Sequence, residues 1–253
     1  MASSTGPAGE LSEADALRAA ADTMAAVRAR CVWSQQITHA DLVPYLVEES
    51  AELIDAVEVG TRADLREELG DLLWQVLFHA AIAAEDPDDP FDIDDVAATL
   101  SEKMIRRHPH VFADAVATTP EEVLVHWNAA KAAEKHTRRS VLDGISPYMP
   151  SLSLAQKLLG RSSAVLSPPF ARLPSRAETA RADRSLGKPA QSRDQLESES
   201  ELGDVMLGLV GTAREQGWDA ERALRGAIRR LEDEIRAAES GGVENSPAAD
   251  LGE

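Results

Sequence analysis

Apolar residues recur every three or four positions through most of the first 140 residues, which is the period of an amphipathic helix. The alternation that marks a half-buried strand is absent from this part of the chain. A first helix is expected from near Ser12 to Arg30, and the segment CVWSQQITHADLVPY after it interrupts the helical period. Together with a composition rich in Ala, Leu, Glu and Arg, the pattern predicts an all-α protein.

The stretch EESAELIDAVEVGTRADLREELGD, residues 48–71, is typical of two amphipathic helices joined at Gly60 and Thr61. Glycine favours the end of a helix, and threonine is a good N-cap for the next one. The second helix is expected to run on to about Ala84. Both helices are apolar around most of their circumference, so we expect them to be buried.

Each of these helices carries carboxylates three or four positions apart, which places each set on one helical face. The carboxylates are Glu48, Glu49 and Glu52 on the first helix and Glu67, Glu68 and Asp71 on the second. An antiparallel hairpin about residue 60 would set Glu49 level with Asp71 and Glu52 level with Glu68. Such a cluster repels itself unless a cation is present, and all-oxygen ligation suits Mg²⁺ or Mn²⁺. A solvated acidic face is the alternative when the motif is taken alone.

Cations gather at the end of a further helix, which is expected from about Asp94 to Arg107. Lys103 and Arg107 lie one turn apart on one face, and Arg106 adjoins them. These residues could hold a polyphosphate, or they could simply complement the dipole at a helix C-terminus. Beside a carboxylate and metal cluster, phosphate binding is the favoured interpretation.

Thr119, Pro120 and Glu122 predict the start of another helix, with an N-cap, a proline at the first position and a capping-box glutamate. Trp127 and Lys131 lie one turn apart on it. The indole could stack on a base while the ammonium contacts phosphate. Packing of Trp127 in the core is the alternative.

The second half of the chain contains a partial repeat of the first. ELGDVMLGLV at residues 201–210 repeats ELGDLLWQVL at residues 68–77, but no EExxE helix precedes it. We therefore expect one active centre per chain and a scaffolding or dimerising role for the second copy. The predicted organisation is a disordered lead (1–11), a catalytic domain (12–139), a connector and mobile linker (140–195), a degenerate helical repeat (196–239) and a disordered tail (240–253).

Charge and composition limit the partners. A formal net charge of −18 argues against nucleic acid or an anionic membrane as a partner. No apolar run approaches the length of a membrane span, and the first residues lack the basic and apolar regions of a signal peptide. The single cysteine, Cys31, permits no internal disulfide. A cytoplasmic protein is expected.

The sequence resembles the MazG family of nucleoside triphosphate pyrophosphohydrolases. The likeness rests on PYLVEESAELIDA, ELGDLLWQVLFHA, EKMIRRHPHVF and HWNAAK, between residues 31 and 134. It implies an all-α, MazG-like helical-bundle homodimer that hydrolyses NTPs or dNTPs with Mg²⁺ to the monophosphate and pyrophosphate, removing non-canonical or excess nucleotides. Carried over by position, the resemblance implies three sets of residues: Glu49, Glu52, Glu68 and Asp71 for Mg²⁺, Lys103, Arg106 and Arg107 for phosphates, and Trp127 with Lys131 for the nucleotide.

Hydrolysis at the α-phosphorus also needs a base for the attacking water. Glu48 and Glu67 flank the expected ligands, and the sequence does not choose between them. A narrower specificity, for dUTP or a phosphoribosyl nucleotide, would keep the same fold. A non-catalytic helical adaptor is the alternative from another class, and it predicts no requirement for a divalent metal.

Overall fold

The structure is a computed structural model that describes residues 16–134, 140–162 and 198–243 of the chain. Every regular element among these residues is a helix, which confirms the predicted all-α class. The chain divides into two compact units, residues 1–135 and 136–253. The predicted lead, most of the predicted linker and most of the predicted tail lie outside the described residues. No helix in the described ranges is both long enough and apolar enough to cross a bilayer.

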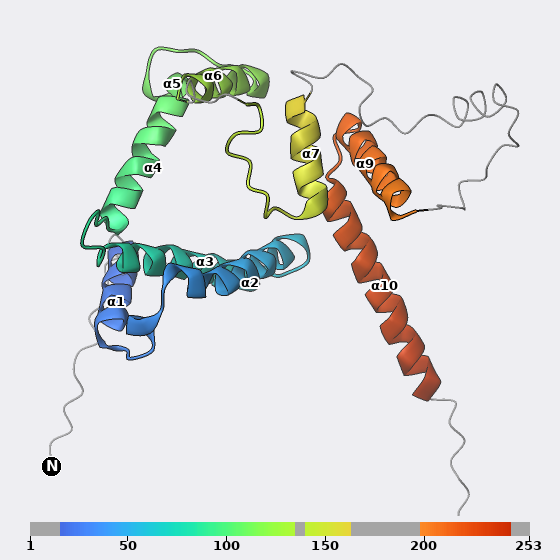
Figure 1. Cartoon of the computed structure of the whole chain (residues 1–253), viewed down its shortest axis with the longest axis horizontal. Coiled ribbons are helices and arrows are strands. Elements are labelled where there is room, and N and C mark those ends of the chain that lie inside the picture. Colours follow the sequence, from blue (N-terminus) through green and yellow to red (C-terminus); the bar gives the residue numbers. More distant parts are fainter. Residues whose placement is uncertain (1–15, 135–139, 163–197, 244–253) are drawn as a thin grey trace, which may run out of the picture. The chain divides into compact units, whose positions relative to one another are not determined.

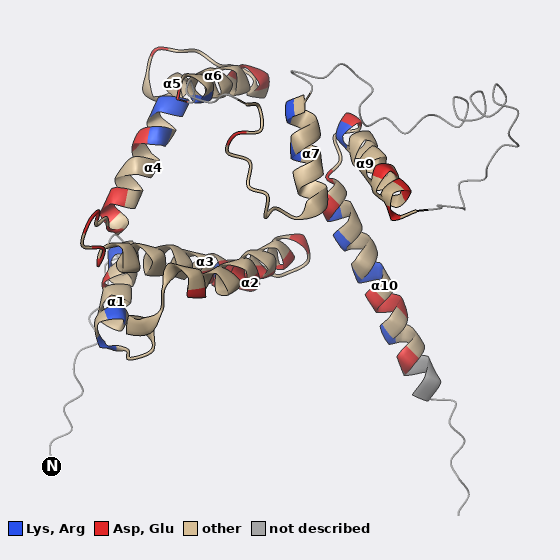
Figure 2. Cartoon of the chain, in the orientation of Figure 1, with Lys and Arg blue, Asp and Glu red and all other residues tan. Residues whose placement is uncertain are grey.

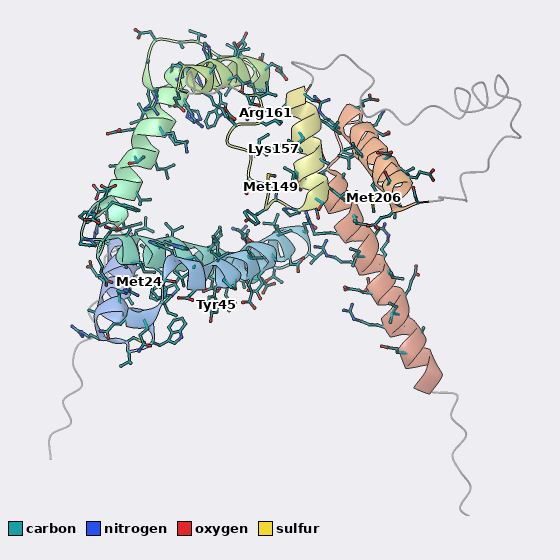
Figure 3. All side chains as sticks on the ribbon, viewed as in Figure 1. Met24, Tyr45, Met149, Lys157, Arg161 and Met206 are labelled. Carbon is teal, nitrogen blue, oxygen red and sulfur yellow. The ribbon has the colours of Figure 1, made fainter. Side chains whose placement is uncertain are left out.

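Three helices build the core of the first unit: α1 (Ala16–Arg30), α2 (His39–Glu58) and α3 (Arg62–Ala83). α2 and α3 pair along their length as a hairpin, and α1 packs against α3 (Figure 1). The buried core consists of Met24, Leu42, Leu77 and Phe78. Met24 lies on the α1 side of this core (Figure 3), so the first helix fixes the position of the hairpin.

A buried arginine holds the segment that interrupts the helical period. Arg28 is 8% exposed, and its guanidinium donates hydrogen bonds to the carbonyls of Ser34 and Ile37 and to both carboxylate oxygens of Glu85. Ser34 begins a short 3-10 helix (Ser34–Gln36). The segment between α1 and α2 is thus attached to the far end of α3 through one side chain.

Helix α2 begins earlier than the sequence suggests. Thr38 caps it by accepting from the backbone N–H of Asp41, whose carboxylate accepts in return from the backbone N–H of Thr38. The expectation that the chain stays irregular through Tyr45 is therefore wrong. Pro44 lies inside the first two turns, where its missing N–H removes one hydrogen bond, and the reciprocal cap helps to offset that loss.

The bend between α2 and α3 depends on close packing. A Cβ atom at Gly60 would lie 2.6 Å from Cα of Ala56, so only glycine fits without a shift of the backbone. Thr61 then caps α3, as predicted, and Asp64 completes the capping box by accepting from the backbone N–H of Thr61. The bend therefore fixes how far each helix runs past the other.

Helix α4 (Ile93–Arg107) follows an acidic loop, residues 84–92, and its N-cap is Asp92 rather than Asp94, where the helix was expected to begin. The Asp92 carboxylate accepts hydrogen bonds from the backbone N–H groups of Asp94 and Asp95. In return, the Asp95 carboxylate accepts from the backbone N–H of Asp92. Both aspartates suit a cap chemically, so pattern alone did not separate them.

Two helices follow α4: the single-turn α5 (Pro109–Phe112) and α6 (Pro120–Ala133). Thr119 is the N-cap of α6, as predicted. The Glu122 carboxylate, however, accepts from the backbone N–H and hydroxyl of Thr118 instead of forming a capping box with Thr119. These two hydrogen bonds hold Thr118, one residue before the N-cap, against the first turn of α6.

The second unit contains three described helices: α7 (Ser151–Ser162), α9 (Glu199–Glu215) and α10 (Ala220–Val243). Gln156 on α7 joins the start of α10 through hydrogen bonds to the Trp218 carbonyl and the Ala220 backbone N–H. Arg161 on α7 donates to the carbonyl of Val141 (Figure 3). α10 extends four residues beyond its predicted end. The interpretation of this unit as a degenerate second copy stays a prediction.

The hairpin helices are less buried than their apolar composition predicts. Val47, Val57 and Leu69 are 63%, 66% and 52% exposed. The expectation of fully buried helices is therefore wrong for the chain alone, because α1 covers only part of the hairpin surface. The uncovered apolar surface is of the kind that a partner covers.

We predict opposite effects for two glycine-to-alanine substitutions in the first unit. Gly60→Ala forces a clash with the Ala56 backbone and should lower the free energy of unfolding by about 1–3 kcal/mol. Gly70→Ala, in α3, meets no atom within 4 Å and should raise it by about 1 kcal/mol through helix propensity. Urea unfolding followed by circular dichroism measures both, and equal effects would contradict the close approach at the bend.

Candidate active site

Three carboxylates meet on the α2–α3 hairpin. Glu49 on α2 and Glu68 and Asp71 on α3 each offer an oxygen, and these oxygens lie within 4.8 Å of one another. Glu49 and Glu68 are half-buried, whereas Asp71 is exposed. We call these three residues the acid cluster. The arrangement follows from the bend at Gly60, which pairs α2 with α3 as a hairpin, and acidic residues occur on both of its helices (Figure 2).

The electrostatics of the acid cluster are those of crowded like charges. Burial, followed by repulsion from Asp71, raises the pKa of Glu49, although a hydrogen bond with Gln75 opposes the rise. Burial, followed by repulsion from Glu52, raises the pKa of Glu68. The strongest charged neighbour of each glutamate is thus the residue expected to lie level with it. The ionised cluster therefore destabilises the fold when no cation is bound.

The remaining acidic residues surround this cluster. Glu52 raises the pKa of both Glu49 and Glu68, but it is not one of the three residues whose oxygens converge. Glu48 and Glu67 are exposed and act on Glu49 and Glu68, respectively, by repulsion. The two residues predicted as bases thus border the acid cluster from α2 and α3.

A buried polar atom distinguishes this cluster from a solvated acidic face. Oε2 of Glu68 is buried and has no hydrogen-bond partner in the described structure. A buried carboxylate oxygen without a partner is costly, and a bound cation would satisfy it. Gln75, one turn beyond Asp71, hydrogen-bonds Glu49. Sequence reasoning missed this glutamine, although it lies on the same helical face as Asp71.

The cations at the end of α4 share one carboxylate. Nε of Arg106 lies 3.0 Å from Oε1 of Glu134, and Nε of Arg107 lies 3.2 Å from both oxygens of the same side chain. Arg107 is 7% exposed, whereas the Arg106 side chain is 53% exposed. The two guanidiniums lower the pKa of Glu134 from 4.5 to about 2. Sequence reasoning missed Glu134, the C-cap residue of α6, which lies three positions after Lys131.

Trp127 packs beside this group. The guanidinium carbon of Arg107 lies 5.0 Å from the centre of the Trp127 ring, and the His108 ring meets the indole edge-on at 5.2 Å. Lys131 is half-buried on the same helix. Lys103 lies a turn before Arg107 and lines a shallow pocket with Phe91 and Leu100. The structure therefore gathers Arg106, Arg107 and Trp127, and Lys103 lies one turn before Arg107 on α4.

The acidic and basic groups occupy separate parts of the first unit. Every charged neighbour that raises the pKa of Glu49 or Glu68 lies on α2 or α3. α4 leads away from the hairpin and carries its cations at the far end, beside α6 (Figures 1 and 2). The described chain does not bring Arg106 or Arg107 into contact with the acid cluster.

The shared carboxylate generates a pH-dependent prediction. Because the folded-state pKa of Glu134 is lowered to about 2, its ionised form stabilises the fold fully above pH 4.5 and loses that effect as the pH falls toward 2. Glu134→Gln should therefore unfold at lower urea concentration than the wild type at neutral pH. The difference between the two midpoints should shrink below pH 4.5. Glu121→Gln, at the exposed start of α6, is the matched control, and a difference independent of pH would contradict the assignment.

Comparison with known proteins agrees with this geometry. The sequence profile of the MazG nucleotide pyrophosphohydrolase domain matches residues 37–112. A Streptomyces cacaoi protein, described as an uncharacterized 26.1 kDa protein in the blaB 3′ region, is 45% identical over 218 residues, which cover 86% of this chain and 80% of that protein. The nucleoside triphosphate pyrophosphohydrolase/pyrophosphatase MazG of Thermotoga maritima is 38% identical, covering 83% of this chain and 79% of the relative.

The nucleoside triphosphate pyrophosphohydrolase of Escherichia coli K12 is 37% identical over 218 residues, which cover 83% of this chain and 80% of the relative. The identity therefore extends through both units and is not confined to the matched domain. The acid cluster falls inside the matched domain, on the hairpin where the sequence first suggested it. The chain belongs to the MazG nucleotide pyrophosphohydrolase family.

Proposed function

We propose that this chain hydrolyses nucleoside triphosphates and deoxynucleoside triphosphates to the monophosphate and pyrophosphate, using Mg²⁺, with Mn²⁺ as a substitute. The observation that carries the proposal is the convergence of Glu49, Glu68 and Asp71 on one point of the hairpin. The names of the Thermotoga maritima and Escherichia coli relatives describe the same class of substrate.

The chemistry of the acid cluster fits a hard divalent cation. Its donors are all carboxylate oxygens, which Mg²⁺ and Mn²⁺ prefer over the nitrogen and sulfur ligands of zinc. The unpartnered Oε2 of Glu68 supports this fit. Glu49, Glu68 and Asp71 would hold the ion, with Glu52 as a further ligand from α2. When bound there, the ion neutralises phosphate charge and activates water.

The reaction itself needs a water, a base and a leaving group. The water oxygen bonds to the α-phosphorus, while the bond from that phosphorus to the oxygen bridging the α- and β-phosphates breaks, and pyrophosphate leaves with the electron pair. Glu48 or Glu67 accepts the proton of the water. Both are exposed at the border of the acid cluster, where an entering substrate can reach them.

We assign the polyphosphate to Lys103, Arg106 and Arg107, and the rest of the nucleotide to Trp127 and Lys131. Glu134 holds the guanidiniums of Arg106 and Arg107 together on one carboxylate. Nη1 of each arginine makes none of the Glu134 contacts described above, and it can donate to a phosphate. The nucleotide would then bind to two guanidiniums that Glu134 already holds in position.

The apolar surface of the hairpin supports a homodimer. Val47, Val57 and Leu69 are each more than half exposed in the chain alone, and a second copy would cover them. The exposed, unpaired Cys31 supports a reducing, cytoplasmic setting. Disposal of non-canonical or excess nucleotides is the role that such a location and activity would serve.

The experiment that tests the proposed function is a product analysis. The purified protein is incubated with a panel of NTPs and dNTPs, with Mg²⁺ or with a chelator, and the products are separated by ion-exchange chromatography. The proposal predicts equal amounts of monophosphate and pyrophosphate, and only with the metal. Diphosphate and orthophosphate would place the cleavage elsewhere, and no turnover of any nucleotide would favour the helical adaptor.

Removing one carboxylate should separate stability from activity. Glu68→Gln removes a charge whose pKa is raised in the fold, so the metal-free variant should melt at or above the wild-type temperature. Mg²⁺ should raise the melting temperature of the wild type but not of the variant, and turnover should fall below detection.

The control for this variant is Glu201→Gln, which changes the equivalent residue of the ELGD segment in α9. It should keep both turnover and the response to Mg²⁺. Wild-type turnover in Glu68→Gln, or an equal loss in Glu201→Gln, would contradict the placement of the active centre on the first hairpin.

Phosphate and base contacts should differ in their dependence on the nucleotide. Lys103→Ala removes one charged phosphate contact and should lower kcat/KM by about thirtyfold, or about 2 kcal/mol, for ATP and CTP alike. Trp127→Ala should lower the two values by different factors, because bases differ in stacking. Lys103 is a cleaner choice than Arg107, whose loss would also leave Glu134 with one partner fewer. Steady-state kinetics with both nucleotides decides, and a base-dependent loss at Lys103 would remove it from the phosphate site.

A further inference from the structure

Helix α10 carries an apolar stripe that the second unit leaves exposed. Leu224, Ile228, Leu231 and Ile235 are 45%, 46%, 56% and 50% exposed. Their spacing of four, three and four residues places them on one face, and it is the spacing of a coiled-coil seam. The helix runs on past α7 and α9 as a single rod (Figure 1). All its described side chains from Leu231 to Glu239 are exposed.

The face of α10 that packs within its unit is polar instead. Glu221 accepts a hydrogen bond from the backbone N–H of Ser153 on α7, and it pairs with Arg225 one turn further along α10. The less exposed positions of α10 include these two residues and Gly226, whereas the stripe residues are all exposed. The apolar stripe is therefore not part of the core of this unit, and such a stripe is typical of a helix that packs on a partner.

The stripe is complementary to itself when a second α10 runs in the opposite direction. With the twofold axis between Arg229 and Arg230, Leu224 lies level with Ile235 of the partner subunit, and Ile228 lies level with Leu231 of the partner subunit. The same two pairs then occur again on the other side of the axis. Each apolar residue of the stripe thus has an apolar counterpart, with no gap in the seam.

Charge decides between the two directions. Residues 220–229 contain three arginines and one glutamate, and residues 230–239 contain two arginines and four acidic residues. The two halves therefore carry net charges of +2 and −2. Figure 2 shows both kinds of charge along the helix. An antiparallel pair sets each half against its opposite, whereas a parallel pair would set like charge against like.

We propose that α10 pairs antiparallel with α10 of a second copy of this chain, with Leu224, Ile228, Leu231 and Ile235 forming the seam. The contact is isologous, so by itself it closes at two chains. It is independent of the acid cluster and of the proposed hydrolysis, because every residue that carries it lies in the second unit. It gives the second half of the chain a role in assembly.

Spin-label distances test both the pairing and its direction. In a Cys31→Ser background, a label is attached to Arg230→Cys or Glu239→Cys, two exposed positions. In an antiparallel pair centred between residues 229 and 230, the labels of the two copies are offset along the axis by about 2 Å at position 230 and by about 28 Å at position 239. Double electron–electron resonance should therefore give a much longer intermolecular distance at 239 than at 230.

Two results would overturn the proposal. Equal distances at the two positions would indicate a parallel pair. The absence of an intermolecular distance at 230 would show that the stripe is covered by another part of the same chain or by a different partner. As a further test, Leu231→Lys should abolish the short distance at 230, whereas Ala237→Lys, an exposed position on the opposite face, should preserve it. Circular dichroism checks that both variants remain equally helical.

Discussion

The carboxylates of Glu49, Glu68 and Asp71 are held together because the bend at Gly60 and the cap at Thr61 fix the level of α2 against α3. Repulsion within the cluster opposes this arrangement, and the hydrophobic contacts of α1 with α3 maintain it. The hairpin is thus a preorganised anionic site, and the energetic cost of preorganisation is met by packing at the opposite end of the helices. Cation binding would relieve the repulsion that folding creates.

In the basic part of the first unit, by contrast, the like charges share a counter-charge within the chain. Arg106 and Arg107 are adjacent cations, and the Glu134 carboxylate holds both of them while its own pKa falls to about 2. The acid cluster is therefore suited to bind a cation, and the arginine group is suited to bind an anion. A nucleoside triphosphate with its metal supplies both, and this makes the proposed substrate chemically consistent with two sites that are separate in the described chain.

Local rules made the helices, the Thr61 and Thr119 caps and the acid pairing predictable from the sequence, because each depends on residues close to one another along the chain. The early start of α2 was missed because the segment that ends at Tyr45 shows no helical period, whereas the reciprocal cap at Thr38 starts the helix within that segment, six residues before Pro44. The bonds of Arg28 to Glu85 and of Arg107 to Glu134 join residues far apart in sequence, and no periodicity reveals such partners. The identity of the metal ion and of the preferred nucleotide depends on molecules that are not part of the chain.

The central claim is that the hairpin, rather than another acidic segment, binds the divalent cation. The loop at Asp86, Asp88 and Asp89 is the natural competitor, because it is acidic and exposed. Titration with substoichiometric Mn²⁺, followed by nuclear magnetic resonance of the backbone amides, separates the two by paramagnetic broadening. The account predicts that signals around Glu49, Glu68 and Asp71 broaden first. Earlier broadening of the loop signals, or uniform broadening of both segments, would contradict it.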